Sequence, residues 1–320
     1  FLESDVSFKI IVFDYYLNFI PFFTNLFSPL FTFIAVIFFT SKMAANTEII
    51  AILNSGMSFK GMLLPYFIGA AVLASLSLYL NNSVIPHANK KRLAFEDTYL
   101  RNKFRNVDRN IHRQIDQETL IYFERFDNIR NIGYKFSLEK IEHGELKYKL
   151  MADHIRWDTV SNKWQIGNYF IRNINGMHET IEVGSKMDTT LNFHPSEFGR
   201  RINNIETMNY TELNQFIEQE HSKGSEKIVF YLLEKYRRFA FPFATFILTL
   251  IGVTLASRKV RGGIGLHIGM GLAISFAYIL FMQISTTFAT NANVTPMLAV
   301  WIPNIIFGIL GLYLLKIAPK

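Results

Sequence analysis

The sequence contains no cysteine among its 320 residues, so no disulfide bond stabilises any part of the chain. Charged residues are also few, at 18%, whereas half of the residues are hydrophobic and 31 are phenylalanine. A soluble globular domain is typically about one-quarter charged. The composition therefore favours a membrane protein, and any domain outside the membrane must fold around its own apolar core.

Motifs for nucleotide hydrolysis and metal binding are missing as well. The sequence has no G-x-x-x-x-G-K-[ST] phosphate-binding loop, and its eight histidines include no H-E-x-x-H pair. The net charge of +7 is spread along the chain and forms no basic stripe interleaved with aromatic residues. We therefore expect a non-catalytic protein with no metal, no cofactor and no nucleic acid partner.

Five segments are long and apolar enough to cross a bilayer, which requires about 20 apolar residues in a helix. None of them contains Asp, Glu, Lys or Arg: Phe22–Thr40, Gly61–Leu80, Phe239–Ser257, Ile264–Phe288 and Met297–Leu315. The fourth contains His267, which we predict to be a hydrogen-bonded packing residue rather than a proton relay. It also contains Gly265 and Gly269, a G-x-x-x-G pair that permits close helix packing.

The positions of Lys and Arg in the short loops predict the orientation in the membrane. Arg258, Lys259 and Arg261 fill one loop, whereas 289–296 contains neither residue type. The first loop and the C-terminus are then cytoplasmic, and both the segment 83–225 and Phe1 lie outside. Because an external start without a leader is unusual, we expect one further helix to precede this sequence, giving three helices, an external domain and three more helices.

The segment between the second and third apolar runs is polar at first and then strand-like. Ile85–Phe104 is predicted to continue the second helix outward. Six strand-like runs separated by turn residues follow: Leu120–Phe126, Ile132–Lys140, Leu146–Trp157, Lys163–Arg172, Met177–Val183 and Met187–Phe193. In the second run, Tyr134, Phe136 and Leu138 are predicted to share one face. Short strands at this spacing predict a small β-sandwich or jelly roll.

Two features lead from this domain into the third apolar run. Thr211–Ser222 is predicted to be a helix capped by Thr211. Lys235, Arg237 and Arg238 then precede the membrane helix on its outer side. Their charged groups either bind anionic lipid or phosphate groups or, as the more usual arrangement, extend to the membrane interface.

Residues 41–60 form a short helix between the first two apolar runs. Asn46 is the expected N-cap, Gly56 supplies a left-handed residue at the other end, and Glu48 lies in the first turn. Apolar residues repeat at helical spacing between them: Ile49, Ile50, Ile52 and Leu53. The helix is either a docking surface for a soluble motor or an interfacial helix in which Glu48 only complements the helix dipole.

This order of a helix pair, a strand-rich outer domain and three terminal helices resembles the LptF/LptG (YjgP/YjgQ) permease subunits of the lipopolysaccharide exporter. Asn46–Ser58 resembles the coupling helix of that family, with its Glu, a downstream Ala and then Gly-x-Ser. The turn Arg258–Gly263, followed by a Gly-rich helix, resembles the second cytoplasmic loop of the family. The first transmembrane helix of the family is missing from the sequence.

The resemblance implies an α+β multi-pass protein of the bacterial inner membrane. It would have transmembrane helices with a cytoplasmic coupling helix (44–56) in 1–106, a periplasmic β-jellyroll-like domain in 107–205, and a linker helix with three transmembrane helices in 206–320. The function implied is that of an ABC exporter permease, which extracts lipopolysaccharide and passes it to a periplasmic bridge. The partners implied are an LptB-like ATPase dimer, an LptF- or LptG-like permease, and LptC- and LptA-like bridge proteins.

The resemblance also implies roles for particular residues. Seven are expected to contact the ATPase: Thr47, Glu48, Ile49, Ala51, Ile52, Gly56 and Ser58. Four large residues of the outer domain are expected to contact acyl chains: Phe123, Phe136, Tyr148 and Trp164. Two alternatives remain at this stage, an FtsX/MacB-like mechanotransmission permease and a membrane anchor that needs no motor. The outer domain of the former normally follows its first helix, whereas two spanning segments precede it here.

Overall fold

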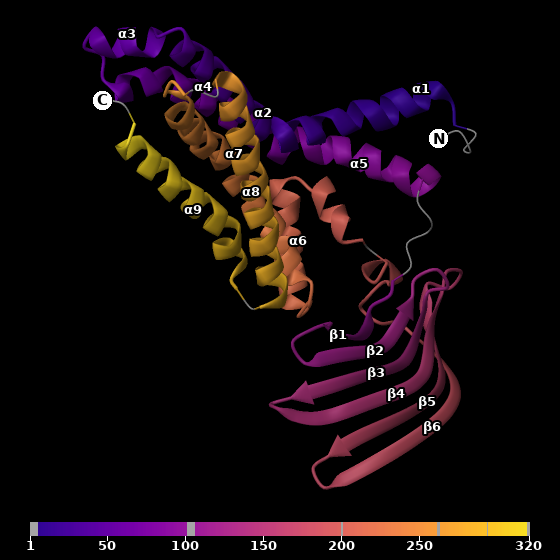
Figure 1. The fold of residues 1–320 in the computed structure, drawn as a ribbon. Helices are drawn as coiled ribbons and strands as arrows, with labels where there is room; N and C mark the ends of the chain where they lie inside the picture. Colours follow the sequence, from indigo (N-terminus) through magenta and orange to yellow (C-terminus); the bar gives the residue numbers. More distant parts are fainter. Residues whose placement is uncertain (1–5, 101–105, 200, 261–262, 293, 319–320) are drawn as a thin grey trace. The chain divides into compact units, whose positions relative to one another are not determined.

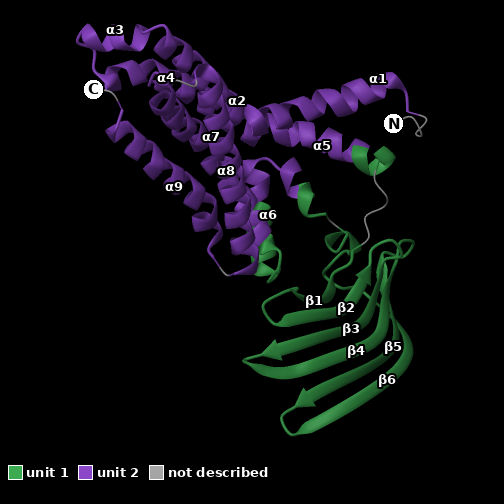
Figure 2. Cartoon of the chain, viewed as in Figure 1, with its two compact units in different colours: residues 1, 96–204, 214–228 green, residues 2–95, 205–213, 229–320 purple. Residues whose placement is uncertain are grey.

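The computed structural model describes residues 6–100, 106–199, 201–260, 263–292 and 294–318. It divides into two compact units, shown in different colours in Figure 2. A sheet unit contains Glu96–Asn204 and Asn214–Ile228, and a helical unit contains Leu2–Phe95, Ile205–Leu213 and Val229–Lys320.

The helical unit confirms all five predicted spans. Five helices are long and apolar enough to cross a membrane: α2 (Leu17–Ala45), α4 (Phe59–Tyr79), α7 (Ile228–Ala256), α8 (Gly263–Asn291) and α9 (Pro296–Lys316). α2 is preceded without a break by α1 (Phe8–Ile10) and the π-helical η1 (Ile11–Tyr16). The second span continues through η2 (Leu80–Val84), α5 (Ile85–Phe95) and η3 (Glu96–Leu100), which confirms the predicted continuation up to Leu100. Residues 101–104 of that prediction lie outside the described residues.

α7 is the central helix of this unit. Its most apolar stretch is 67% buried within the chain, against 22% for α2, α4 and α8, so those three present most of their surface to the surroundings. α2 packs closely on α8 because Gly271 has no side chain, and a Cβ there would lie 2.3 Å from Ile37 Cδ1. Polar contacts are made inside the unit as well, since Asn304 accepts a hydrogen bond from the Tyr278 hydroxyl and donates one to the Ala240 carbonyl, both at 2.8 Å.

The sheet unit contains one six-stranded antiparallel sheet in which every strand pairs with its neighbours in sequence (Figure 1). The strands are β1 (Arg109–Gln114), β2 (Thr119–Asp127), β3 (Ile132–Glu142), β4 (Glu145–Asp158), β5 (Lys163–Asn175) and β6 (His178–Thr189). An antiparallel strand domain inserted between the helices is thus confirmed. Its order is a simple meander, whereas a sandwich or jelly roll would divide the strands between two sheets.

The number of strands agrees with the prediction but two of their positions do not. The runs Met177–Val183 and Met187–Phe193 are replaced by the single strand β6, since Gly184–Lys186 continue the pairing with β5. β1 was not predicted, because its sequence Arg-Asn-Ile-His-Arg-Gln has a single apolar residue.

One row of residues interrupts the alternation of the strands. Asn110 of β1, Lys135 of β3 and Asn168 of β5 all have positive φ, near 50°. Lys135 and Asn168 both bond to Asp153 of β4, so they lie on one row across the sheet. Buried residues on β3 are accordingly Gly133, Phe136 and Leu138, three and then two residues apart. The prediction that Tyr134 shares the face of Phe136 was wrong, because the extra residue at the row changes the alternation.

The linker helix is present but its cap differs from the prediction. α6 (Tyr210–Ser222) follows the short 3₁₀ segments η4 (Pro195–Glu197) and η5 (Ile202–Thr207). The Asn209 side chain accepts from the Glu212 amide, and the Glu212 carboxylate accepts from the Asn209 amide, both at 2.9 Å. This reciprocal pair is a capping box, so Asn209 and not Thr211 is the cap.

Replacing Gly133 with Ala tests the packing of the sheet. A Cβ at this position would lie 2.4 Å from the fully buried Phe123 ring and 3.0 Å from Ile155. We expect Gly133→Ala to lower the free energy of unfolding by about 1–3 kcal/mol, as overpacked cores do. Gly199→Ala is the control, since its Cβ would make an ordinary contact at 3.5 Å. Thermal unfolding of the full chain measures both, and equal midpoints would contradict this packing.

Candidate functional site

The predicted coupling segment folds as the separate seven-residue helix α3 (Glu48–Asn54). The residue that precedes it is Thr47, in the left-handed conformation with φ of 64° and with no hydrogen bond from its side chain to the helix. The prediction that Asn46 caps the helix was therefore wrong, and Asn46 instead donates to the Glu48 carboxylate at 2.9 Å. Gly56 has the predicted positive φ, at 91°.

α3 is attached to the helical unit along one side only. Ile49 is 1% exposed and packs in a core with Ala44, Phe59 and Met62, whereas the adjacent Ile50 is 51% exposed. Glu48 and Ala51 are exposed as well. The helix therefore has an anchored side and a free side, and the free side presents one carboxylate and one large apolar group.

The remaining predicted coupling residues lie at the edges of α3. Ser58 is the N-cap of α4 and accepts from the Gly61 amide at 3.2 Å. Ile52 lines an apolar groove of about 460 Å³ between α2, α3 and α4. The other residues of this groove are Phe39, Met43, Met57, Gly61, Met62, Pro65 and Tyr66.

The G-x-x-x-G pair of α8 faces away from the described part of this chain. A Cβ at Gly265 or Gly269 would meet no described atom within 4 Å. His267, between them, is buried and shares a hydrogen bond of 2.8 Å with the Ser41 hydroxyl of α2. The prediction that His267 is a hydrogen-bonded packing residue is thus confirmed, and the glycines leave a strip of α8 open.

An ionic cluster lies at the start of α7. Arg238 is 4% exposed and bonds to Glu234 at 3.0 Å, to the Met208 carbonyl at 2.7 Å and to the Ile205 carbonyl at 3.1 Å. Arg237 bonds to the other oxygen of Glu234 at 2.6 Å. The predicted extension of Arg238 to the membrane interface was wrong, since its guanidinium is directed inward and is fully used by protein groups.

A cavity of about 360 Å³ lies next to this cluster, among α2, α4, α5, α7 and α8. Most of its wall is apolar, and the cluster residues Glu206, Glu234, Arg237 and Arg238 line it too. Three buried polar side chains also line it, and within the described part of the chain each has an oxygen without a hydrogen-bond partner: Asn25, Asn89 and Ser275. The cavity is therefore amphipathic, with hydrogen-bonding groups in an otherwise apolar wall.

The pKa of Glu206 gives a test of this cluster. Burial raises it, and the Glu234 carboxylate raises it further. The folded state then retains a proton that the unfolded state releases, so stability falls as pH rises above the ordinary value of 4.5. Glu206→Gln removes this loss. We expect its midpoint of thermal unfolding to exceed that of the wild type at pH 7 and to approach it near the ordinary value.

Glu218→Gln, on an exposed side chain of α6, is the control and should show no such pH-dependent difference. A Glu206→Gln difference that is the same at all pH values would contradict the raised pKa.

In the sheet unit, the predicted lipid-contacting residues lie on the packed face. Phe123, Phe136 and Trp164 are at most 1% exposed and belong to one cluster of buried side chains. The Trp164 indole donates to the Phe193 carbonyl at 3.1 Å, so it also ties the segment after β6 to the sheet. Tyr148 lies at the margin of this cluster and is half-buried.

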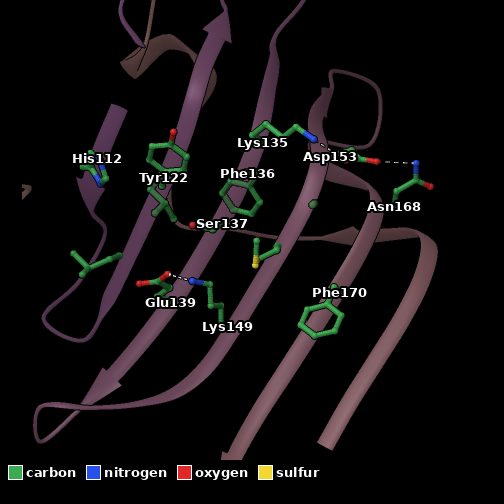
Figure 3. A pocket seen from close by; sticks show the side chains of 14 residues that line it. His112, Tyr122, Lys135, Phe136, Ser137, Glu139, Lys149, Asp153, Asn168 and Phe170 are labelled. Atoms are coloured by element: carbon green, nitrogen blue, oxygen red, sulfur yellow. Dashed lines mark hydrogen bonds and ion pairs between the residues drawn. The ribbon is translucent and has the colours of Figure 1, made fainter. Parts of the chain in front are cut away.

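The opposite face of the sheet contains a shallow hollow of about 730 Å³ (Figure 3). Its charged side chains pair across strands, Glu139 with Lys149 at 2.7 Å and Lys135 with Asp153 at 3.2 Å. Apolar and aromatic groups such as Tyr122 and Phe170 lie between them. This face has the alternating ion pairs of a solvated sheet surface, in contrast to the apolar packed face.

Sequence reasoning missed the cluster members outside α7. Asn89, Arg92 and Glu206 come from distant segments, and Arg92 pairs with Glu206 at 3.5 Å across 114 residues. The i, i+4 spacing of Glu234 and Arg238 was the available local signal, because such pairs meet on a helix.

Comparison with known proteins gives one family. The sequence model of the family described as "Lipopolysaccharide export system permease LptF/LptG" matches residues 1–317, nearly the whole chain. No curated protein matches the chain.

Proposed function

The chain belongs to the LptF/LptG family of lipopolysaccharide export permeases, and from this premise we propose that it is the permease subunit of an ABC exporter. It would extract lipopolysaccharide from the inner membrane and pass it to a periplasmic bridge. The family and the five apolar helices indicate a non-catalytic, multi-pass protein of the inner membrane. An LptB-like ATPase dimer would supply the energy, and a homologous LptF- or LptG-like permease would complete the membrane part.

The orientation follows from the positive-inside rule. The basic turn at 258–263 and α3 would face the cytoplasm, and the sheet unit would lie in the periplasm, next to LptC- and LptA-like bridge proteins. Gly265 and Gly269 support a contact with the partner permease, since the strip of α8 that they leave open admits a close helix.

The geometry of α3 is the observation that carries this proposal. A helix that only reversed the chain direction would need no free face. α3 instead fixes Ile49 in the core and presents Glu48, Ile50 and Ala51 outward. A force applied to α3 passes directly to α2 and α4, because Ile49 packs between their ends.

Substitution of Glu48 tests the docking of the ATPase. A carboxylate here can pair with a cation of the ATPase, and removing one member of a shielded pair costs about 2–5 kcal/mol of binding. We expect Glu48→Ala to reduce recovery of the ATPase with the purified permease, while the permease keeps its midpoint of thermal unfolding. Asn54→Ala, exposed at the end of the same helix, is the control. Normal recovery and normal export in Glu48→Ala would instead leave Glu48 the role of complementing the helix dipole.

Photo-crosslinking tests the lipid path through the sheet unit. We expect a photoreactive residue at Tyr148, at the margin of the packed face, to capture lipopolysaccharide only while the ATPase turns over. Phe123, Phe136 and Trp164 would give adducts under the same condition if the lipid enters between the packed side chains. Met151 is the control, because it lies on the opposite face and is exposed. Adducts at Met151 and at none of the other four would place the lipid on the ion-paired face.

A further inference from the structure

Residues 205–208 are held by their backbone rather than by their side chains. The guanidinium of Arg238 donates to two of their carbonyls, those of Ile205 and Met208. The Asn89 amide of α5 donates to a third, that of Glu206, at 3.3 Å. We call residues 205–208 the strap.

Arg238 is suited to this position by its shape. Its Nε donates to Glu234 while each terminal nitrogen donates to one strap carbonyl. A planar guanidinium presents these donors in a fixed fork, which the single ammonium of Lys does not reproduce. Arg237, its neighbour, bonds to Glu234, and no bond from it to the strap is found among the described residues.

The strap forms part of the wall of the amphipathic cavity. Glu206 of the strap and its holders Asn89 and Arg238 all line that cavity. The unpaired oxygens of Asn25, Asn89 and Ser275 lie on side chains that are at least 96% buried. Polar groups inside a membrane bundle typically face water or a polar substrate. The cavity therefore needs an opening through which polar groups enter.

The strap is also the place where the chain returns from the sheet unit. Part of that unit ends at Asn204, one residue before the strap, and begins at Glu96, four residues after Arg92. Arg92 pairs with Glu206, so both crossings of the chain are tied into one network within the helical unit.

We propose that the strap closes the polar end of this cavity and opens to pass the headgroup of a lipid, and that Arg238 is the positioning residue that holds it closed. The identity of the cargo rests on the proposed function, whereas the closure itself does not. A change in the sheet unit would reach the strap through the covalent chain, and the strap would release its carbonyls from Arg238 and Asn89.

Cysteine labelling tests this closure, because the natural sequence contains no thiol. Ser275→Cys places one thiol in the cavity wall, and its rate of modification by a charged maleimide is measured for the full chain in membranes. In the Arg238→Lys background we expect that rate to rise about tenfold or more, since losing one charge-assisted hydrogen bond changes an equilibrium by at least that factor. Arg237→Lys should leave the rate unchanged.

A second thiol separates opening from general loosening. Ser77 is buried as deeply as Ser275 but does not line the cavity, so Ser77→Cys should label at the same slow rate in both backgrounds. A rise at both thiols, or at neither, would overturn the strap. If Arg238→Lys does not fold, the pair Asn89→Cys and Glu206→Cys joined by a short bifunctional thiol reagent decides the question. Joining them should slow labelling of Ser275→Cys, and an unchanged rate would contradict the proposal.

The same crosslinked variant distinguishes this inference from the proposed function. Labelling requires neither the ATPase nor lipopolysaccharide. A strap that gates labelling in a protein that never binds or releases lipopolysaccharide would contradict the proposed function alone. Undiminished lipid release from the crosslinked complex would contradict the strap alone.

Discussion

Every polar group inside the helical unit needs a partner within the protein, because the core of a bilayer offers no water to supply one. This constraint explains where the interior contacts of the unit lie. Asn304 joins α7, α8 and α9 by bonding to both Tyr278 and the Ala240 carbonyl. Ser41 and His267 join α2 to α8, and Asn25 joins α2 to Asn81 of η2. These contacts fix the order of the helices, since apolar side chains alone pack equally well against lipid.

The same constraint gives α7 its two halves. Its second half packs through small and apolar side chains against α2, α8 and α9. Its first half contains Glu234, Arg237 and Arg238, and the three groups neutralise one another and bond to backbone carbonyls. α7 is therefore both the apolar centre of the bundle and the attachment point for the segment that returns from the sheet. The free helix α3, at the other end of the unit, depends on one buried side chain, Ile49.

Properties set by short stretches of sequence were predictable. The five spans follow from their length and lack of charge, and α3 follows from the apolar spacing between Asn46 and Gly56. Properties set by distant residues were not. The strap joins Asn89 to Glu206 across 117 residues, and neither residue has a local pattern that indicates the other. Phe123 and Trp164 were chosen by size and alternation, which identify an apolar face but cannot tell a closed core from an open groove.

The row of left-handed residues has a consequence for how this sheet can vary. At that row each central strand contains one residue more than a simple alternation requires, and the strands keep a common register on both sides of it. The strands are thus in phase only because the extra residue occurs in all of them. Deleting Lys135 alone would turn Phe136 and Leu138 outward while β2 and β4 kept their faces. Changes of length at this row are therefore tolerable only when neighbouring strands change together, so that the sheet behaves as a single inherited block.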